Sequence, residues 1–191
     1  MILFDGIELF HASYMIVKKP DLSACASGKD FGRGFYLTTN YEQACRFVKT
    51  SVEKAVKNGI KDIEKNVGYV SVFKYNERAE KNISYYEFSS AGNDWLHCVV
   101  AHRKSGLLNG EISKWKKYDI LAGKIANDST NQVITAYMNG FYGKIGSDEA
   151  YQTAIRFLLP NKLSDQICFR TKKALASISF QKYKTIKIAG R

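Results

Sequence analysis

Short strand-like segments and amphipathic segments follow one another along this chain without alternating strictly. The clearest strand-like segment is GYVSVFKY at residues 68–75, which is dominated by aromatic and β-branched residues. The clearest helical segment follows Thr39-Asn40, either of which suits an N-cap, and carries apolar residues at helical spacing as far as Gly59. A doubly wound fold needs strands and helices in strict alternation, so this order predicts an α+β protein.

Segments of both kinds recur along all 191 residues. Strands are expected at 7–11, 35–38, 68–75, 82–88, 118–126, 166–169 and 178–188, and helices at 40–59, 94–104, 129–138, 147–159 and 171–176. Only 2 prolines occur, and no Pro-rich linker divides the chain. We therefore expect a single domain over residues 1–191.

The charge of the chain is large and uneven. Lys and Arg number 29 and Asp and Glu number 18, which gives a net charge of +11, and no acidic residue follows Asp165. A basic surface attracts polyanions such as nucleic acid, acidic proteins or anionic lipid. The alternative is a solubilising face without a specific partner.

Several classes of protein are disfavoured by what the sequence lacks. No apolar run approaches the roughly 18 residues of a spanning helix, and the start MILFDGIELF is acidic where a signal peptide is basic. We therefore expect a cytoplasmic protein without a membrane partner. The cysteines form no C-x-x-C pair, and the H-C-x-x-x-H string at residues 97–102 has no fourth ligand nearby, so we expect free thiols and no metal.

The segment DFGRGFYLTTNYEQA at residues 30–44 has the residue types of a nucleotide-binding loop. Gly32 and Gly34 let the backbone approach another group closely. Arg33 between them is a cation on a flexible loop, which suits a phosphate and equally suits solvent. The glycine spacing matches neither the Rossmann fingerprint nor the P-loop.

Two aromatic residues add a second feature to this segment. Tyr36 opens an expected strand, and Phe47 lies 11 residues later in the expected helix. Their rings could form a two-sided slot for a planar heterocycle. Either ring could instead belong to the core, as the helical spacing of Phe47 allows.

The stretch GRGFYLTTNYEQA followed by Phe47 resembles the nicotinamide clamp of ADP-ribosyltransferases of the diphtheria-toxin and poly(ADP-ribose) polymerase class. That class has a His–Tyr–Glu triad on three strands; His11-Ala12-Ser13 matches the first motif and Tyr36, 25 residues after His11, the second. With YDILAGKIAND and DQICFRT, the resemblance to a small bacterial branch extends over residues 7–180. It implies an ADP-ribosyltransferase-like split antiparallel β-sandwich core with flanking helices.

The resemblance also implies that NAD is the substrate and that no metal is needed. His11 would hydrogen-bond the adenosine ribose, Ser13 would support the nicotinamide ribose side, and the backbone of Ala12, usually Gly in the family, would grip the nicotinamide amide. Tyr36 and Phe47 would hold the nicotinamide ring. The implied NAD-binding set is His11, Ala12, Ser13, Asp30, Arg33, Gly34, Phe35, Tyr36 and Phe47. From its own residue type alone, His11 could equally be a structural histidine.

The third motif differs from the family pattern, because Gln166 stands where the family has the Glu that binds the ribose 2′-hydroxyl. Gln can hydrogen-bond a hydroxyl, but it cannot act as a base or carry charge. This favours a single transfer to a reactive nucleophile, a carboxylate from elsewhere, or a catalytically inactive binder. Asp128, which also suits an N-cap, is the first candidate for that carboxylate and Asp30 the second. The expected catalytic set is therefore Tyr36, Gln166 and Asp128, although Gln166 could be an ordinary polar strand residue.

Three functions follow as hypotheses. The first is an NAD-dependent mono-ADP-ribosyltransferase acting on a protein or nucleic acid. The family analogy suggests for it the role of the toxin in a toxin–antitoxin or phage-defence pair, with an acidic antitoxin as partner. The second is an NAD or ADP-ribose binding module without transfer. The third is a nucleic-acid-binding protein whose scaffold resembles the transferase.

Overall fold

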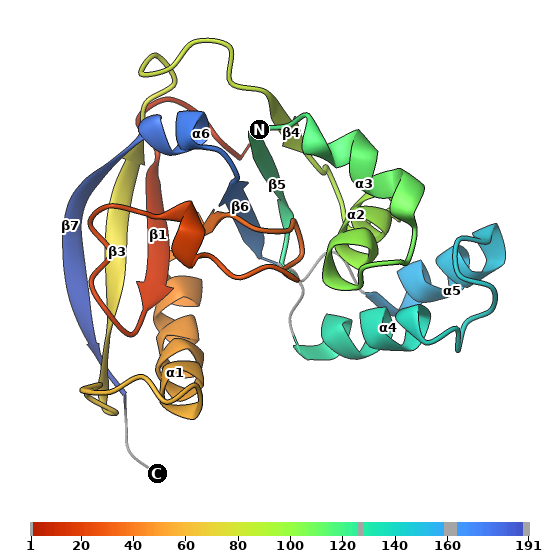
Figure 1. Ribbon diagram of the computed structural model, residues 1–191, viewed down its shortest axis with the longest axis horizontal. Helices are drawn as coiled ribbons and strands as arrows, with labels where there is room; N and C mark the ends of the chain where they lie inside the picture. Colours follow the sequence, from red (N-terminus) through yellow and green to blue (C-terminus); the bar gives the residue numbers. More distant parts are fainter. Residues whose placement is uncertain (1, 126–127, 159–163, 189–191) are drawn as a thin grey trace.

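Two β-sheets with helices packed on them make up the described part of the chain, residues 2–125, 128–158 and 164–188 of this computed structural model (Figure 1). The first sheet has the strand order β1-β3-β7 and is antiparallel throughout. Its strands are β1 (Glu8–Ser13), β3 (Val67–Tyr75) and β7 (Ile178–Lys187). β7 is an edge strand, and most of its residues are exposed.

The second sheet has the order β2-β6-β5-β4 and contains one parallel pair, β4 with β5. Its strands are β2 (Phe35–Leu37), β6 (Asp165–Phe169), β5 (Ile120–Lys124) and β4 (Tyr85–Glu87). An antiparallel bridge between Phe10 and Thr38 links β1 to the residue after β2. The two sheets are therefore joined where the candidate motifs lie.

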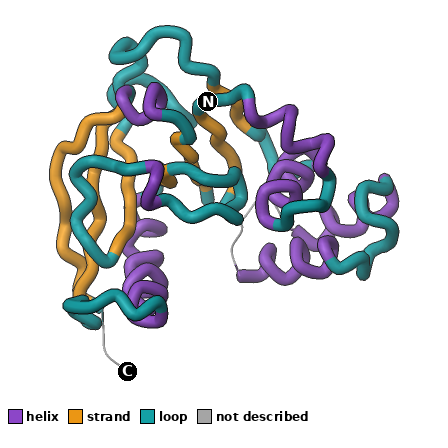
Figure 2. Tube along the Cα trace, viewed as in Figure 1, coloured by secondary structure: helices purple, strands orange, loops and turns teal. Residues whose placement is uncertain are grey.

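Helices pack beside both sheets, α1 (Tyr41–Lys57) next to β1 of the first sheet and α2 to α5, within residues 93–158, on the far side of the second (Figures 1 and 2). α1 begins after Asn40, whose side chain accepts the hydrogen bond of the Gln43 amide at 2.9 Å as the N-cap prediction requires. α1 packs on β1 and β3 through Ala44, Val48 and Val52. The helices near the second sheet are α2 (Asn93–Arg103), α3 (Asn109–Lys116), α4 (Asp128–Met138) and α5 (Asp148–Leu158), while α6 (Lys172–Ala176) connects β6 to β7.

Strand alternation divides the core between the two faces of the second sheet. One face turns Phe35, Leu37, Ile167 and Phe169 toward Leu9 and Phe73 of the first sheet. The other face carries Tyr36 and Cys168, which pair across β2 and β6, and packs against the helical side with Trp95, Tyr137 and Tyr151. Gln166 lies two residues before Cys168, so it shares this second face.

The prediction of an α+β protein is confirmed, and most expected elements are present within a few residues of their expected ends. α3 was not predicted, because Asn109-Gly110 opens it and charged residues interrupt its apolar pattern. Helix α3 is held in place by Trp115, which is only 4% exposed and packs against Tyr86 and Phe88. Within the part of the chain that the structure describes, no helix combines the length and the hydropathy needed to cross a bilayer.

Candidate functional site

Three of the expected site residues lie on neighbouring strands. His11 is on β1, Tyr36 on β2 and Gln166 on β6, and these strands are adjacent through the Phe10–Thr38 bridge and the β2–β6 pairing. The His11 Nδ1 donates a hydrogen bond to the Tyr36 carbonyl oxygen at 2.8 Å. Residues from the two ends of the sequence are thus brought to one region of the two-sheet junction.

The environment of His11 fixes which ring nitrogen carries the proton. Its ring packs on Phe35 with the centroids 4.3 Å apart, on the side of β1 that faces the second sheet. A carbonyl oxygen can only accept, so Nδ1 carries the hydrogen and Nε2 is the acceptor of the neutral ring. Burial lowers the pKa of His11, and the hydrogen bond to Tyr36 only partly opposes this. At neutral pH, His11 therefore offers an acceptor nitrogen.

The lowered pKa of His11 predicts a pH-dependent stability. The unfolded chain takes up the proton first, near the ordinary histidine value of about 6.5, so stability is lost as the pH falls below that value. Burial also lowers the pKa of His97 and of His102, which adds to the same trend. We expect the melting temperature to fall between about pH 7 and pH 5. His11→Asn, whose amide can still donate to the Tyr36 carbonyl, should make that fall smaller; an unchanged slope in thermal unfolding would show that His11 does not titrate in this way.

Ala12 and Ser13 complete the first motif with different surroundings. The Ala12 side chain lies on the α1 side of β1, together with the apolar residues of that helix. Ser13 is buried, and its Oγ accepts a hydrogen bond from the Met15 amide at 3.3 Å. The side chain of Ser13 thus shapes the turn that leaves β1.

The Tyr36 hydroxyl is bound to the loop that precedes β2. It accepts a hydrogen bond from the Phe31 amide at 2.9 Å and donates one to the Gly32 carbonyl at 2.8 Å. Burial of the hydroxyl raises the pKa of Tyr36 well above its ordinary value. The ring is therefore held under residues 31–32 and acts, in this structure, as an anchor of the loop.

Phe47, the second expected ring of the clamp, lies on α1 with an open aromatic surface. Its side chain is 43% exposed, and the Lys54 Nζ lies 5.6 Å from the ring centroid. Gln43, one helical turn earlier on the same face, donates a hydrogen bond to the Asp165 carbonyl at 3.2 Å, so this face of α1 is turned toward the start of β6. No ring contact joins Phe47 to Tyr36 among the described residues. The structure does not bring the two expected rings of the clamp together.

The glycines of the loop have a packing role. A Cβ on Gly34 would collide with the Cys168 Sγ and lie 2.8 Å from the Phe169 carbonyl oxygen. Gly32 has a φ of +78°, and a Cβ there would meet the His102 ring. Close approach to β6 and α2 therefore explains both glycines. Arg33 between them is exposed and forms no ion pair with any described residue.

Replacing Gly34 with alanine should destabilise the protein because the new methyl group has no space against β6. Overpacking of this kind costs about 1–3 kcal/mol. Gly110→Ala is the matched control, since a Cβ there meets nothing within 4 Å and Gly110 lies in α3. We expect that control to be neutral or stabilising by up to about 1 kcal/mol. Urea unfolding of both variants tests this, and equal stabilities would contradict the packing account.

Gln166 is buried, with 5% of its surface exposed, and its amide is doubly bound. Nε2 donates to the Asp30 Oδ2 at 2.7 Å and to the Lys124 carbonyl oxygen at 3.0 Å. Asp30 is 7% exposed and is paired with Arg103, whose Nε lies 2.8 Å and whose Nη2 lies 2.5 Å from Oδ1. Asp30 is therefore in direct hydrogen-bond contact with Gln166. The sequence places Asp30 in the expected NAD-binding set and makes it the second candidate for the carboxylate.

Two other groups around this network were not expected from the sequence. Arg103, the last residue of α2, also donates to the Asn131 Oδ1 of α4 at 2.8 Å. Asp165 accepts hydrogen bonds from the Thr38 Oγ1 and the Thr39 amide, both at 2.9 Å, and from the Thr39 hydroxyl. Arg103 belongs to none of the motifs, and Asp165 opens the DQICFRT stretch, in which only Gln166 is expected to have a role. Asp128 is the first residue of α4, but its side chain lies outside the described residues.

Two lysines bring positive charge near the same region. The pKa of Lys29 is lowered, first by desolvation and then by the neighbouring Lys54 ammonium. Lys29 directly precedes Asp30, and Lys54 lies over the Phe47 ring. Lys54 of α1 thus lies beside Phe47, and Lys29 of the loop is close enough to Lys54 for their charges to interact.

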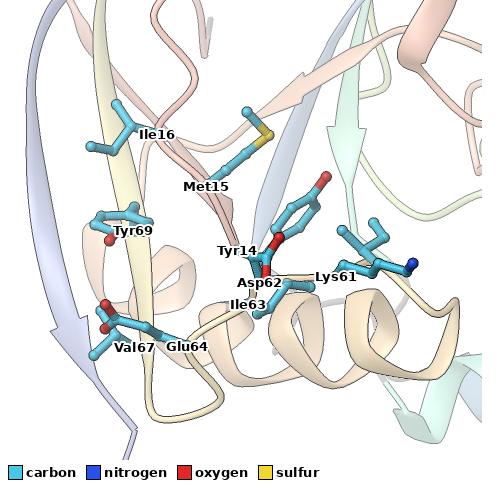
Figure 3. Close-up of a pocket in the computed structure, with 10 residues that line it drawn as sticks. Tyr14, Met15, Ile16, Lys61, Asp62, Ile63, Glu64, Val67 and Tyr69 are labelled. Carbon is cyan, nitrogen blue, oxygen red and sulfur yellow. The ribbon is translucent and has the colours of Figure 1, made fainter.

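One hollow described in the structure lies away from these residues. It has a volume of about 490 Å³ and is lined by residues that follow β1 and α1, including Tyr14, Met15 and Ile63 (Figure 3). Its lining contains none of His11, Tyr36 and Gln166. Among the described residues, no group of three or more His, Cys, Asp and Glu side chains could hold a metal ion.

The architecture defines an α+β protein with a polar network at the junction of two sheets. The chain belongs to the family described as "Protein of unknown function (DUF3990)", whose model matches residues 7–180. No curated protein and no solved structure matches the chain.

Proposed function

We propose that this protein is an NAD-dependent mono-ADP-ribosyltransferase that transfers ADP-ribose to a macromolecule and releases nicotinamide. The observation that carries the proposal is the placement of His11, Tyr36 and Gln166 on three adjacent strands, with the His11 ring bonded to the Tyr36 backbone. The resemblance of the motifs around these residues to the transferase class supports the same reading. We also propose that the two sheets form the split β-sandwich of that class.

Each part of NAD has a suitable group in this arrangement. The His11 Nε2 can accept a ribose hydroxyl hydrogen, because Nδ1 is the donor to Tyr36. The exposed Phe47 ring can stack on the nicotinamide. Lys29 and Lys54 can attract the pyrophosphate, because paired cations bind phosphate oxygens strongly. Tyr36 then keeps the loop in place behind the site, while Phe47 provides the open stacking surface.

The reaction requires little proton transfer from the protein. The bond between the ribose C1′ and the nicotinamide nitrogen breaks, and its electron pair neutralises the pyridinium. The sugar becomes an oxocarbenium-like cation, a nucleophile of the acceptor forms the new C1′ bond, and the acceptor's proton passes to solvent. Gln166 can hold a hydroxyl of the ribose through its Oε1, but it cannot remove the acceptor's proton. Catalysis therefore depends on orientation, and the acceptor must be reactive by itself.

The acceptor is proposed to be a protein or a nucleic acid, and the biological role that of a toxin restrained by an acidic antitoxin. The net charge of +11 supports either kind of polyanionic partner. Lys182, Lys184 and Lys187 lie exposed on β7, in the part of the chain that has no acidic residue after Asp165. The charge alone does not distinguish an acceptor from an inhibitor.

One observation favours a second candidate, an NAD or ADP-ribose binding module. Gln166 stands where the transferase class has its glutamate, and both hydrogens of its amide are used in hydrogen bonds within the protein. A site without a base can bind the nucleotide and leave its glycosidic bond intact.

Transfer of label from NAD distinguishes the two functions. NAD labelled on the adenosine is incubated with the protein and a cell lysate, and the label is measured in the protein and nucleic-acid fractions. The transferase predicts label in one fraction with the wild type and much less with Phe47→Ala. Binding of NAD without label in either fraction would support the binding module instead, and absence of binding would contradict both.

A further inference from the structure

We propose that Asp30 is a positioning residue: it fixes the orientation of the Gln166 amide, so that Oε1 is the atom that remains free to bind a ligand. Because Asp30 is already paired with Arg103, position 166 then requires a neutral side chain such as glutamine. That Oε1 binds a substrate hydroxyl rests on the proposed function. The orientation of the amide rests only on the hydrogen bonds around Gln166.

The orientation of the amide follows from its two partners. The Asp30 carboxylate and the Lys124 carbonyl can only accept hydrogen bonds, and they lie 2.7 Å and 3.0 Å from Nε2. An amide turned the other way would place its oxygen against two acceptors. Both hydrogens of the Gln166 amide are therefore used, and no described residue donates to its Oε1. The only hydrogen-bonding atom of Gln166 left for a ligand is therefore an acceptor, as a carboxylate oxygen of the glutamate in the transferase class would be.

The charge balance explains why glutamine occupies this position. Arg103 is the cation bonded to Asp30, through two of its nitrogens. A glutamate at position 166 would place a second carboxylate in hydrogen-bond contact with Asp30. Two carboxylates at such a distance cannot both be ionised readily, and they share a proton. A neutral amide avoids this conflict and keeps the acceptor oxygen.

The groups that surround the Asp30–Gln166 pair come from several elements. Charged groups are Arg103 from α2 and Lys29 from the loop, and the neutral titratable groups are Tyr36 from β2, Cys168 from β6 and Cys98 from α2. The side chain of Asp128 lies outside the described residues. Among the described residues, Arg103 is the cation that pairs with the Asp30 carboxylate at the centre of this cluster.

The test exchanges the amide and the carboxylate between positions 30 and 166. Gln166→Glu alone should be stable at low pH and lose stability as the pH rises, because Asp30 raises the pKa of the new carboxyl above its unfolded value of about 4.3. We expect its melting temperature at pH 8 to be roughly 6–12 °C below that of the wild type. The double variant Asp30→Asn/Gln166→Glu should recover most of this loss, because the new amide at position 30 can donate to the new carboxylate at position 166 and Arg103 can still pair with that carboxylate.

The matched control is Gln132→Glu, an exposed position on α4, which should change little at any pH. A Gln166→Glu melting temperature as insensitive to pH as this control, or a double variant no more stable than the single one, would overturn the proposal. These readouts need no NAD, so they are independent of the proposed function.

Nicotinamide release by the same variants links the positioning to the reaction. Asp30→Ala should lower kcat about tenfold or more with a smaller effect on KM, because the Gln166 amide then loses the acceptor that fixes its orientation. An Asp30→Ala variant with unchanged kcat would contradict the positioning role. If even the wild type releases no nicotinamide while the stability pattern holds, the proposed function fails and the positioning of Gln166 stands.

Discussion

An Arg103→Ala variant should be less stable than the wild type by about 3 kcal/mol or more at neutral pH, because it leaves a buried carboxylate without its cation. Asp30 is 7% exposed, and Arg103 holds it through two nitrogens while also bonding Asn131. The single change therefore removes the ion pair that ties the loop before β2 to the end of α2 and, through Asn131, to α4. Urea unfolding measures the loss directly.

Arg46→Ala is the matched control for this prediction. Arg46 is exposed in the middle of α1, where alanine is an equally good helix former. We expect this control to change the free energy of unfolding by less than about 0.5 kcal/mol. The double variant Asp30→Asn/Arg103→Ala should be less affected than the sum of the single ones, since it also removes the carboxylate charge that Arg103 balances. Equal losses for Arg103→Ala and Arg46→Ala would contradict the buried ion pair.

A Phe47→Ala variant should fold normally and release nicotinamide far less efficiently. Its side chain is 43% exposed, so its truncation costs little packing. The loss of aromatic stacking on a planar ring is worth about 1–3 kcal/mol, which corresponds to roughly 5- to 150-fold in kcat/KM. The initial rate of nicotinamide release over a range of NAD concentrations measures this effect.

Phe157→Ala serves as its control, because Phe157 is 58% exposed on α5 and belongs to no part of the proposed site. We expect this variant to keep wild-type activity. A Phe47→Ala enzyme as active as the Phe157→Ala enzyme would exclude Phe47 from the nicotinamide site and leave Tyr36 as the remaining aromatic candidate.

The local features of the fold could be predicted from the sequence because they depend on neighbouring residues. The Asn40 cap and the helix after it need only a few adjacent side chains and a helical period. The strand expected from residue 82 begins at Tyr85, because Asn82 has a φ of +60° and cannot belong to a regular strand. The strand order was not readable from any such pattern.

The site shows the same limit more sharply. His11, Tyr36 and Gln166 were selected by resemblance to known motifs, and the strand order brings them to adjacent strands. The bond between Asp30 and Arg103 joins residues 73 positions apart, and neither residue type nor spacing marks such a pair in advance. The glycines at 32 and 34 were recognised as special, but their close neighbours proved to be His102 and Cys168 of the protein itself. Partners that meet only through tertiary structure leave no local signal.

Release of nicotinamide from NAD labelled in that ring tests the central claim most directly. The purified protein is assayed with and without cell lysate, beside Phe47→Ala rather than a Tyr36 variant, because the Tyr36 hydroxyl anchors the loop before β2. The account predicts release by the wild type that increases when lysate supplies an acceptor and that is strongly reduced in Phe47→Ala. Absence of release under both conditions, from a protein that is folded and binds NAD, would contradict it.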